Sequence, residues 1–417
     1  MKSKKEDQLN ELYKPQIFEV TPGHQQECEL TSLEKQNKKI SVNFSDEKIE
    51  KQGLLSKPKF TCKITCEELS SSVVRTLDDF EWLKDQLNEK YPLIFVPPLP
   101  PKEKNEDPKI KLRYLEKFFN SIIRKKILRT SPIIQEFLML DDKNFNVYKK
   151  SLNENKFNLL LTMENFKSNK PQLKYDFKRE QIYLPEKYIK RLEPTRALYN
   201  SLDQAINQVA NDFSNLQKHM KEISDLFGNL NKTAKDTDQS DLTKRVYEKL
   251  KTIFSSWSVS YQKQNEFFEQ DFKEIFKYIN LELNELNLIH SQYMKFRNNY
   301  ETLGIELINK REKLFAEKKY NKWELSKEDE LKLDSFKDNH DEAMKYICKE
   351  FNEVVTAQKI EVACSCNIVM KEFRHVNKYI GEQLKKYFET LKERNQTIVG
   401  DAFNVVKLFN VQIESEN

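Results

Sequence analysis

Apolar and polar residues alternate along two short stretches in the first quarter of the chain. The sequences KISVNF and KFTCKITCE each place every second side chain on one apolar face. A period of two indicates a strand that buries one face. We therefore predict a small sheet with a hairpin connection around Gly53. The predicted strands are residues 39–44, 59–67 and 70–75, and the connection is 46–58.

From about residue 193 onward, apolar residues recur at spacings of three and four, which is typical of helices with one buried face. All thirteen prolines lie at or before Pro194, and glycine is rare beyond it. Because proline costs about 3 kcal/mol inside a helix, this composition favours long helices. The predicted blocks are about 194–230 with Pro194 in the first turn, 241–319, and 326–394 behind a Ser326/Asp329 capping box.

The composition divides the chain into four parts. Residues 1–37 are polar and are predicted to be disordered. A first folded domain spans 38–142, and a helical domain spans 193–417. Residues 143–192 form a linker whose apolar side chains suggest an amphipathic helix. This helix either packs on the neighbouring domain or contacts a bilayer.

Basic residues lie beside stiff elements in the stretch before residue 130. The turn PPLPP fixes φ at its four prolines and is followed by Lys102. Arg75 stands just before a predicted helix, and Lys111 and Arg113 open the next one. Stiff elements lose little entropy when a ligand is bound. The pattern therefore predicts an anion-binding pocket rather than a proline-rich loop with solvated lysines.

The order of these features resembles a phox-homology (PX) domain, the phosphoinositide-binding module of the sorting nexins. The resemblance covers about residues 38–142 and implies an α+β fold, a small antiparallel sheet plus helices. It rests on Arg75, Asp79-Phe80, Trp82-Leu83, Tyr91-Pro92, Pro97 to Lys102, Leu115 with Phe118, Ser131-Pro132 and Phe137-Leu138.

Two departures from the PX pattern concern headgroup choice. The resemblance implies that the phosphoinositide ligands are Arg75, Lys102, Lys111 and Arg113. The family usually carries Arg-Arg-Tyr where this chain has Arg75-Thr76-Leu77. In that pattern the second arginine grips the 3-phosphate and the aromatic ring packs on inositol. Lys111 also stands where arginine is usual, and lysine cannot bind phosphate bidentately. We therefore expect weakened or altered phosphoinositide selectivity.

Long helices that follow a PX domain resemble a BAR domain, the dimerisation module of one sorting-nexin subgroup. The resemblance implies an all-α domain of three long helices. It also implies a homodimer, or a heterodimer with another BAR sorting nexin. A basic cluster ends the second block and is the predicted membrane contact, with a solvated helix end as the alternative; it comprises Lys310, Arg311, Lys313, Lys318, Lys319 and Lys322. The candidate membrane-inserting residues of the linker are Phe157, Leu160, Leu161 and Phe166.

Charge and motif content argue against other functions. The net charge of +5 is below the excess expected of a dedicated nucleic-acid binder. No stretch approaches 18 consecutive apolar residues, and the first residues lack the apolar core of a signal peptide. The histidines and cysteines form no metal-ligand spacing, and no glycine-rich phosphate loop occurs. We expect no metal, no cofactor and no enzymatic activity.

The two resemblances thus imply a cytoplasmic protein that is peripheral on endosomal membranes and acts in cargo sorting and vesicle trafficking. It would bind phosphoinositides through the PX domain and sense or induce curvature through a BAR dimer. The expected partners are an anionic phosphoinositide membrane, another BAR chain, and retromer-like or cargo proteins, but no nucleic acid. The alternative is a PX-containing coiled-coil scaffold that binds protein partners with little lipid selectivity.

Overall fold

The computed structural model describes residues 2–20, 40–50, 59–100, 108–152, 173–325 and 327–414. Within it, the chain divides into two compact units. The first unit combines Met1–Lys190 with Asn284–Arg374, and the second combines Arg191–Leu283 with His375–Asn417. The longest helices contribute residues to both units.

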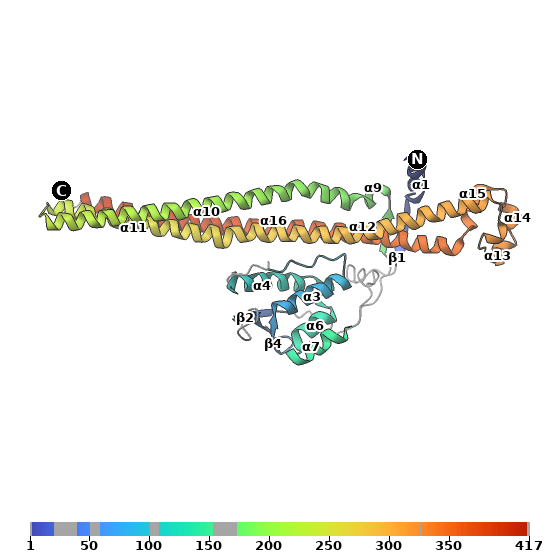
Figure 1. Cartoon of the computed structure of the whole chain (residues 1–417), viewed down its shortest axis with the longest axis horizontal. Helices are drawn as coiled ribbons and strands as arrows, with labels where there is room; N and C mark the ends of the chain where they lie inside the picture. The colour runs from blue at the N-terminus through green and yellow to red at the C-terminus, as the bar shows by residue number, and fades with distance from the viewer. Residues whose placement is uncertain are drawn as a thin grey trace. The chain divides into compact units, whose positions relative to one another are not determined.

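Among the described residues of the first unit, three strands form an antiparallel sheet in the order β2–β3–β4 (Figure 1). They are β2 (Val42–Glu50), β3 (Lys59–Cys66) and β4 (Ser71–Thr76). Every second residue of β3 from Phe60 onward is buried, as its alternation predicts. The pairing of β2 with β3 continues past a bulge between Ser45 and Lys48. Residues 46–50 therefore belong to a strand and not to the predicted connection.

The helices after β4 close the core over this sheet. Helix α4 contacts β2, while α6 and α7 contact β4. Phe80, Phe119 and Phe137 are fully buried, and the rings of Phe80 and Phe137 meet edge to face at 5.2 Å. The α+β prediction is confirmed. These helices are α3 (Leu77–Lys90), α4 (Pro108–Arg124), α5 (Lys126–Arg129), α6 (Pro132–Met139) and α7 (Asp142–Ser151).

Residues 2–20 are folded, which corrects the prediction of disorder for this part of 1–37. Helix α1 (Lys2–Leu12) leads into β1 (Gln16–Val20), and β1 pairs antiparallel with β5 (Leu173–Phe177). The side chain of Tyr13 is buried and stacks on Phe177 at 5.5 Å. Residues 21–37 lie outside the described residues.

Helix α12 (Lys273–Ala316) provides the surface on which this N-terminal segment lies. The Tyr13 hydroxyl donates to Glu301 Oε1 at 2.7 Å, and the Tyr300 hydroxyl donates to Leu12 O at 2.7 Å. Gly304 leaves room for Leu12, because a Cβ there would lie 2.4 Å from Leu12 Cδ2. A polar sequence is thus ordered by partners that lie about three hundred residues away.

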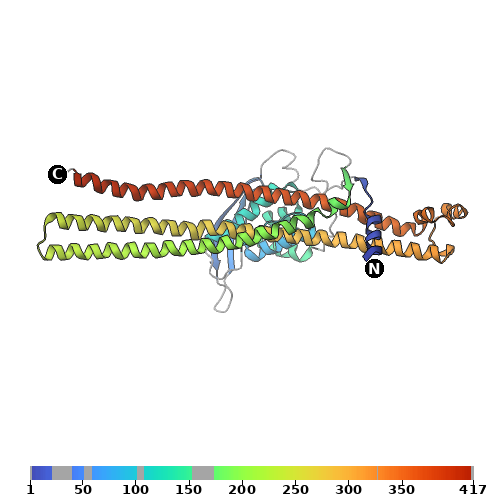
Figure 2. The same cartoon turned by 90° about the horizontal axis from the view of Figure 1, so that it is seen from above.

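The second unit is built from long helices, as predicted. Helices α10 (Leu184–Asp236) and α11 (Asp241–Phe267) run side by side (Figure 2). A π-helical turn, η1 (Phe268–Phe272), joins α11 to α12, so the second predicted block is continuous. Helix α10 begins ten residues before Pro194, so Pro194 lies inside the helix and not in its first turn. Helix α9 (Arg179–Ile182) precedes it.

The third predicted block is wrong at its start, because residues 320–348 form short helices instead of one long helix. Cys348 adopts a φ of 57°, which interrupts the helical path, and α16 (Lys349–Glu414) begins directly after it. Trp323 is fully buried and stacks on Phe336, which holds this segment together. Ser326 lies outside the described residues. The short elements are η2 (Tyr320–Lys322), α13 (Lys327–Glu330), α14 (Leu333–Phe336) and α15 (His340–Tyr346).

Candidate functional site

Arg75, at the end of β4, points into the fold. Its residue surface is 1% exposed, and its guanidinium donates to the carbonyl oxygens of Phe137, Val74 and Leu140. The guanidinium carbon lies 4.3 Å from the centre of the Phe145 ring. Burial lowers the pKa of Arg75, although nearby carboxylates oppose that change. Arg75 therefore joins β4 to α6 and α7 and is not placed at a surface that a phosphate reaches.

Thr76 is the N-cap of α3, at the position where the PX pattern has its phosphate-gripping arginine. Its hydroxyl accepts from the Asp79 N–H at 3.2 Å, and the Asp79 carboxylate accepts from the Thr76 N–H at 2.9 Å. Lys149 from α7 donates to Asp79 at 2.6 Å. Burial acts to raise the pKa of Asp79, but the hydrogen bonds from Lys149 and Thr76 outweigh it and lower that pKa.

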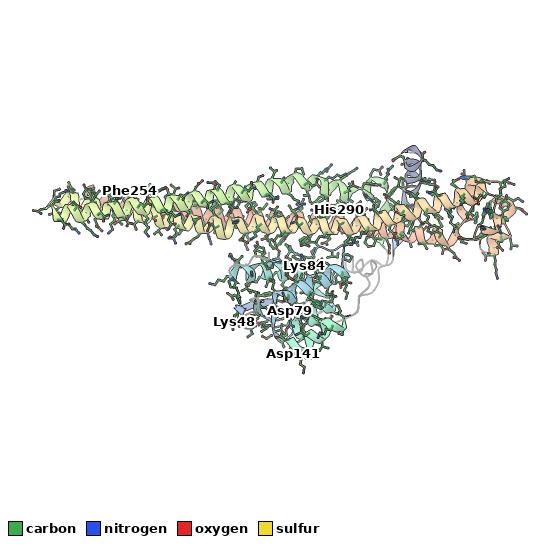
Figure 3. The ribbon with its side chains drawn as sticks, in the orientation of Figure 1. Lys48, Asp79, Lys84, Asp141, Phe254 and His290 are labelled. Atoms are coloured by element: carbon green, nitrogen blue, oxygen red, sulfur yellow. The ribbon has the colours of Figure 1, made fainter. Side chains whose placement is uncertain are left out.

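The first turn of α3 therefore already holds an internal carboxylate (Figure 3 labels Asp79 and Lys84 on this helix). Helix N-termini favour anions because their first N–H groups have no partner within the helix. The capping box supplies that anion from the chain itself. A headgroup phosphate at this point would compete with Asp79.

Two of the remaining predicted ligands lie on α4. Helix α4 buries Tyr114, Leu115 and Phe118 in the core. Arg113 is exposed, and Lys111 is half-buried. Lys102 lies outside the described residues, so its position relative to Lys111 and Arg113 is not tested. Lys102, Lys111 and Arg113 stay predictions.

Comparison with known proteins identifies the first domain. Residues 65–141 match the family model of the PX domain. Over 73 residues the chain is 38% identical to Sorting nexin MVP1 of Kluyveromyces lactis, covering 16% of this chain and 14% of that protein. Over 230 residues it is 25% identical to Sorting nexin 1 of Arabidopsis thaliana, covering 50% of this chain and 54% of that protein. The chain thus matches only part of each relative.

A solved structure extends the likeness to the helices. The cryo-EM structure of the SNX-BAR Mvp1 tetramer aligns with a TM-score of 0.57 at 16% identity, covering 88% of this chain and 98% of that chain. The chain has the fold of a PX-BAR sorting nexin. Its PX domain contains β2–β4 and α3–α7, and its BAR region contains α10, α11, α12 and α16.

Sequence reasoning missed a polar cluster that joins the PX domain to the BAR helix α16. Glu372 accepts from the Phe95 N–H at 3.0 Å, and Lys125 donates to the Phe95 carbonyl at 3.0 Å. Lys125 and Glu372 also form an ion pair with each other. No local pattern signals this cluster, because Lys125 and Glu372 are 247 positions apart in the chain.

The basic cluster predicted to contact membrane is partly engaged within the BAR region. Lys310 pairs with Glu324 at 2.6 Å, and Lys319 pairs with Glu317 at 2.6 Å. Arg311 is half-buried and donates to the Ile347 carbonyl at 2.7 Å. Acidic residues also outnumber basic ones between 320 and 348. A membrane-contact role for the cluster stays a prediction, and Lys313, Lys318, Lys319 and Lys322 are exposed.

The remaining predictions concern the linker residues, membrane-spanning helices and metal ligands. Phe157, Leu160, Leu161 and Phe166 lie outside the described residues. In the part of the chain that the structure describes, no helix has the length and apolar character needed to span a bilayer. Within the same residues, no three acidic, histidine or cysteine side chains are grouped as metal ligands.

Proposed function

We propose that this PX-BAR protein is a peripheral membrane protein of endosomal cargo sorting and vesicle trafficking. It binds phosphoinositides through its PX domain and senses or induces curvature as a BAR dimer. The observation that carries this proposal is one chain that combines a PX domain with long antiparallel helices. The relatives named above are sorting nexins, and the aligned Mvp1 structure is a tetramer, which supports self-association.

The proposed lipid contacts are basic groups near the proline turn. Lys102, Lys111 and Arg113 are the headgroup ligands in this proposal. Between residues 100 and 130 the chain has ten lysines and arginines against four acidic residues. A basic residue near an anionic leaflet contributes about 1 kcal/mol. This excess supports attraction to anionic lipid even where headgroup selectivity is weak.

The proposed dimer surface is the set of large apolar side chains that the second unit leaves exposed. A second copy of this chain, or another BAR chain, would cover them, because exposed apolar side chains in such number favour association. They are Leu198, Leu202, Val209, Leu216, Leu226, Leu230, Leu242, Val259, Phe388 and Phe403. A dimer would carry two PX domains, so two weak sites bind one membrane with avidity.

Vesicle experiments test this proposal. The purified chain is mixed with phosphatidylcholine vesicles that contain phosphatidylserine, with or without phosphatidylinositol 3-phosphate, and flotation and vesicle shape are measured. We expect flotation with anionic vesicles, further binding with the phosphoinositide, and tubules at high protein density. A dimer that neither floats with anionic vesicles nor deforms them would contradict the proposal.

A second candidate function is a scaffold that binds protein partners with little lipid selectivity. The observation that favours it is the β4–α3 junction, where Arg75 is buried and Asp79 occupies the helix N-terminus. The substitution Thr76→Arg separates the two functions. A lipid-binding PX domain gains affinity for phosphatidylinositol 3-phosphate when the family arginine is restored. A scaffold gains none, and its wild type binds phosphoinositide vesicles no better than matched phosphatidylserine vesicles.

A further inference from the structure

The segment that leads into the proline turn is buried, and side chains bind both backbone polar groups of Phe95. Leu93, Ile94, Phe95 and Val96 are buried, although none of them belongs to a helix or strand. A buried segment without regular structure needs other partners for its backbone N–H and C=O groups. At Phe95, side chains provide both partners: Glu372 for the N–H and Lys125 for the carbonyl.

These two side chains are themselves nearly closed to solvent. The side chains of Lys125 and Glu372 are 10% and 8% exposed, and they form an ion pair. The Lys125 ammonium also lies 4.9 Å from the centre of the Phe95 ring. Each of the three residues is therefore bound to both of the others. Such a closed network fixes geometry, because no member can move without losing two partners.

This network lies next to the proline turn in the chain. Phe95 precedes the proline turn by two residues, and the proposed ligand Lys102 follows that turn. Pro97, Pro98 and Pro100 are buried, so the turn continues the fixed path of the segment before it. Glu372 belongs to the BAR helix α16, which therefore holds the segment that leads into the proline turn.

We infer that Glu372 is a positioning residue for phosphoinositide binding, through which the BAR region orients the proline turn of its own PX domain. This inference rests on the proposed lipid-binding function. Glu372 does not touch lipid. It acts by holding Phe95, and binding energy then need not be spent on ordering the turn.

A second ion pair between the PX domain and the BAR helices serves as a matched control. Lys84 on α3 donates to Glu285 on α12 at 2.5 Å, and their side chains are 17% and 11% exposed (Figure 3 labels Lys84). This pair resembles the first in chemistry and burial but does not contact Phe95. Loss of either pair is expected to lower overall stability, whereas only loss of Glu372 releases the turn.

The test uses the full chain with the variants Glu372→Ala, Glu285→Ala and Glu372→Gln. Hydrogen exchange of the Phe95 amide is measured without lipid. Flotation is measured with phosphatidylinositol 3-phosphate vesicles and with phosphatidylserine vesicles of equal charge, and urea unfolding tracks stability. We expect Glu372→Ala to speed exchange at Phe95 and to weaken the phosphoinositide-specific part of binding about tenfold. In Glu285→Ala, the exchange rate of the Phe95 amide and the phosphoinositide-specific binding should both stay within about twofold of wild type.

The conservative variant keeps the inference testable if alanine prevents folding. Glu372→Gln retains a side-chain oxygen that accepts from the Phe95 N–H, so we expect it to restore most of the protection and part of the binding. If both alanine variants weaken binding equally, or if Phe95 exchange is unchanged in Glu372→Ala and Glu372→Gln, the inference is overturned. If wild type does not distinguish the two vesicle types, the proposed phosphoinositide function itself fails.

Discussion

At the β4–α3 junction of the PX domain, charged side chains are turned inward, whereas the helices of the second unit leave large apolar side chains in solvent. Arg75 is 1% exposed and Asp79 is held in a capping box. Leu198 and Phe403, in contrast, are 70% and 67% exposed. The first region has satisfied its polar groups within the chain. The second leaves large apolar side chains exposed, and in the proposed dimer a second copy covers them.

In the proposed function, this difference indicates which of the two regions contributes more to membrane binding. A headgroup site with an internal carboxylate at its helix N-terminus gains less from a phosphate. Exposed apolar helices gain about 25 cal/mol for each square ångström that a second copy covers. Assembly is therefore expected to contribute more to membrane binding than the affinity of one PX domain.

The largest expected effect is the loss of Arg75. Arg75→Ala leaves the carbonyl oxygens of Phe137 and Leu140 without their donor and opens a space beside Phe145. We expect the free energy of unfolding to fall by about 3–5 kcal/mol, measured by urea unfolding. Arg113→Ala, at an exposed position, is the control and should change stability by about 0.5 kcal/mol or less. Equal stability of both variants would show that Arg75 is not a structural residue.

The next largest effect concerns the proposed dimer surface. Leu226 is 62% exposed on α10, and Leu226→Glu would place a charge in the proposed dimer surface. We expect the free energy of dimerisation to weaken by about 1.5–3 kcal/mol per protomer. Analytical ultracentrifugation would detect the weaker dimer. Leu331→Glu is the control, because Leu331 is 89% exposed but lies outside the second unit. Unchanged dimerisation in Leu226→Glu would exclude this face as the interface.

A smaller effect is expected where the N-terminal segment lies on α12. Gly304→Ala places a methyl group 2.4 Å from Leu12 Cδ2, so Leu12 must move. Overpacking costs about 1–3 kcal/mol, and the gain in helix propensity of about 1 kcal/mol offsets part of it. We expect faster proteolysis within residues 2–20. Gly381→Ala meets nothing within 4 Å and should keep wild-type proteolysis; equal rates in both variants would contradict the packing.

Local patterns in the sequence were enough to predict the small sheet, the PX resemblance and the long helices. The alternation in β3 and the three-to-four spacing beyond residue 193 each report a buried face within one element. They do not report which distant residue will satisfy a polar group. The polar pattern around Tyr13 therefore predicts disorder although Tyr13 bonds Glu301, and no pattern marks Glu372.

The same limit applies to the direction of a charged side chain and to breaks in a helix. Arg75 alternates correctly within β4, but only the packing of α6 and α7 shows that its side is the buried one. The apolar spacing between 326 and 348 is compatible with a helix. A left-handed Cys348 and the aromatic core around Trp323 override it.

The smallest expected effect concerns the N-terminal cap of α3 at the β4–α3 junction. Thr76→Ala removes a hydroxyl that caps the helix and binds Asp79, so we expect a loss of about 1 kcal/mol at neutral pH. Thr76→Ser retains the hydroxyl and is the control. Because the folded state lowers the pKa of Asp79, its contribution is present above the unfolded value of 3.8 and is lost as pH falls below it. Urea unfolding from about pH 5 to about pH 3 should therefore show a steeper loss of stability in wild type than in Thr76→Ala. Identical slopes would mean that the Thr76 hydroxyl does not stabilise the Asp79 carboxylate, and that Lys149 and the Thr76 N–H hold it without the hydroxyl.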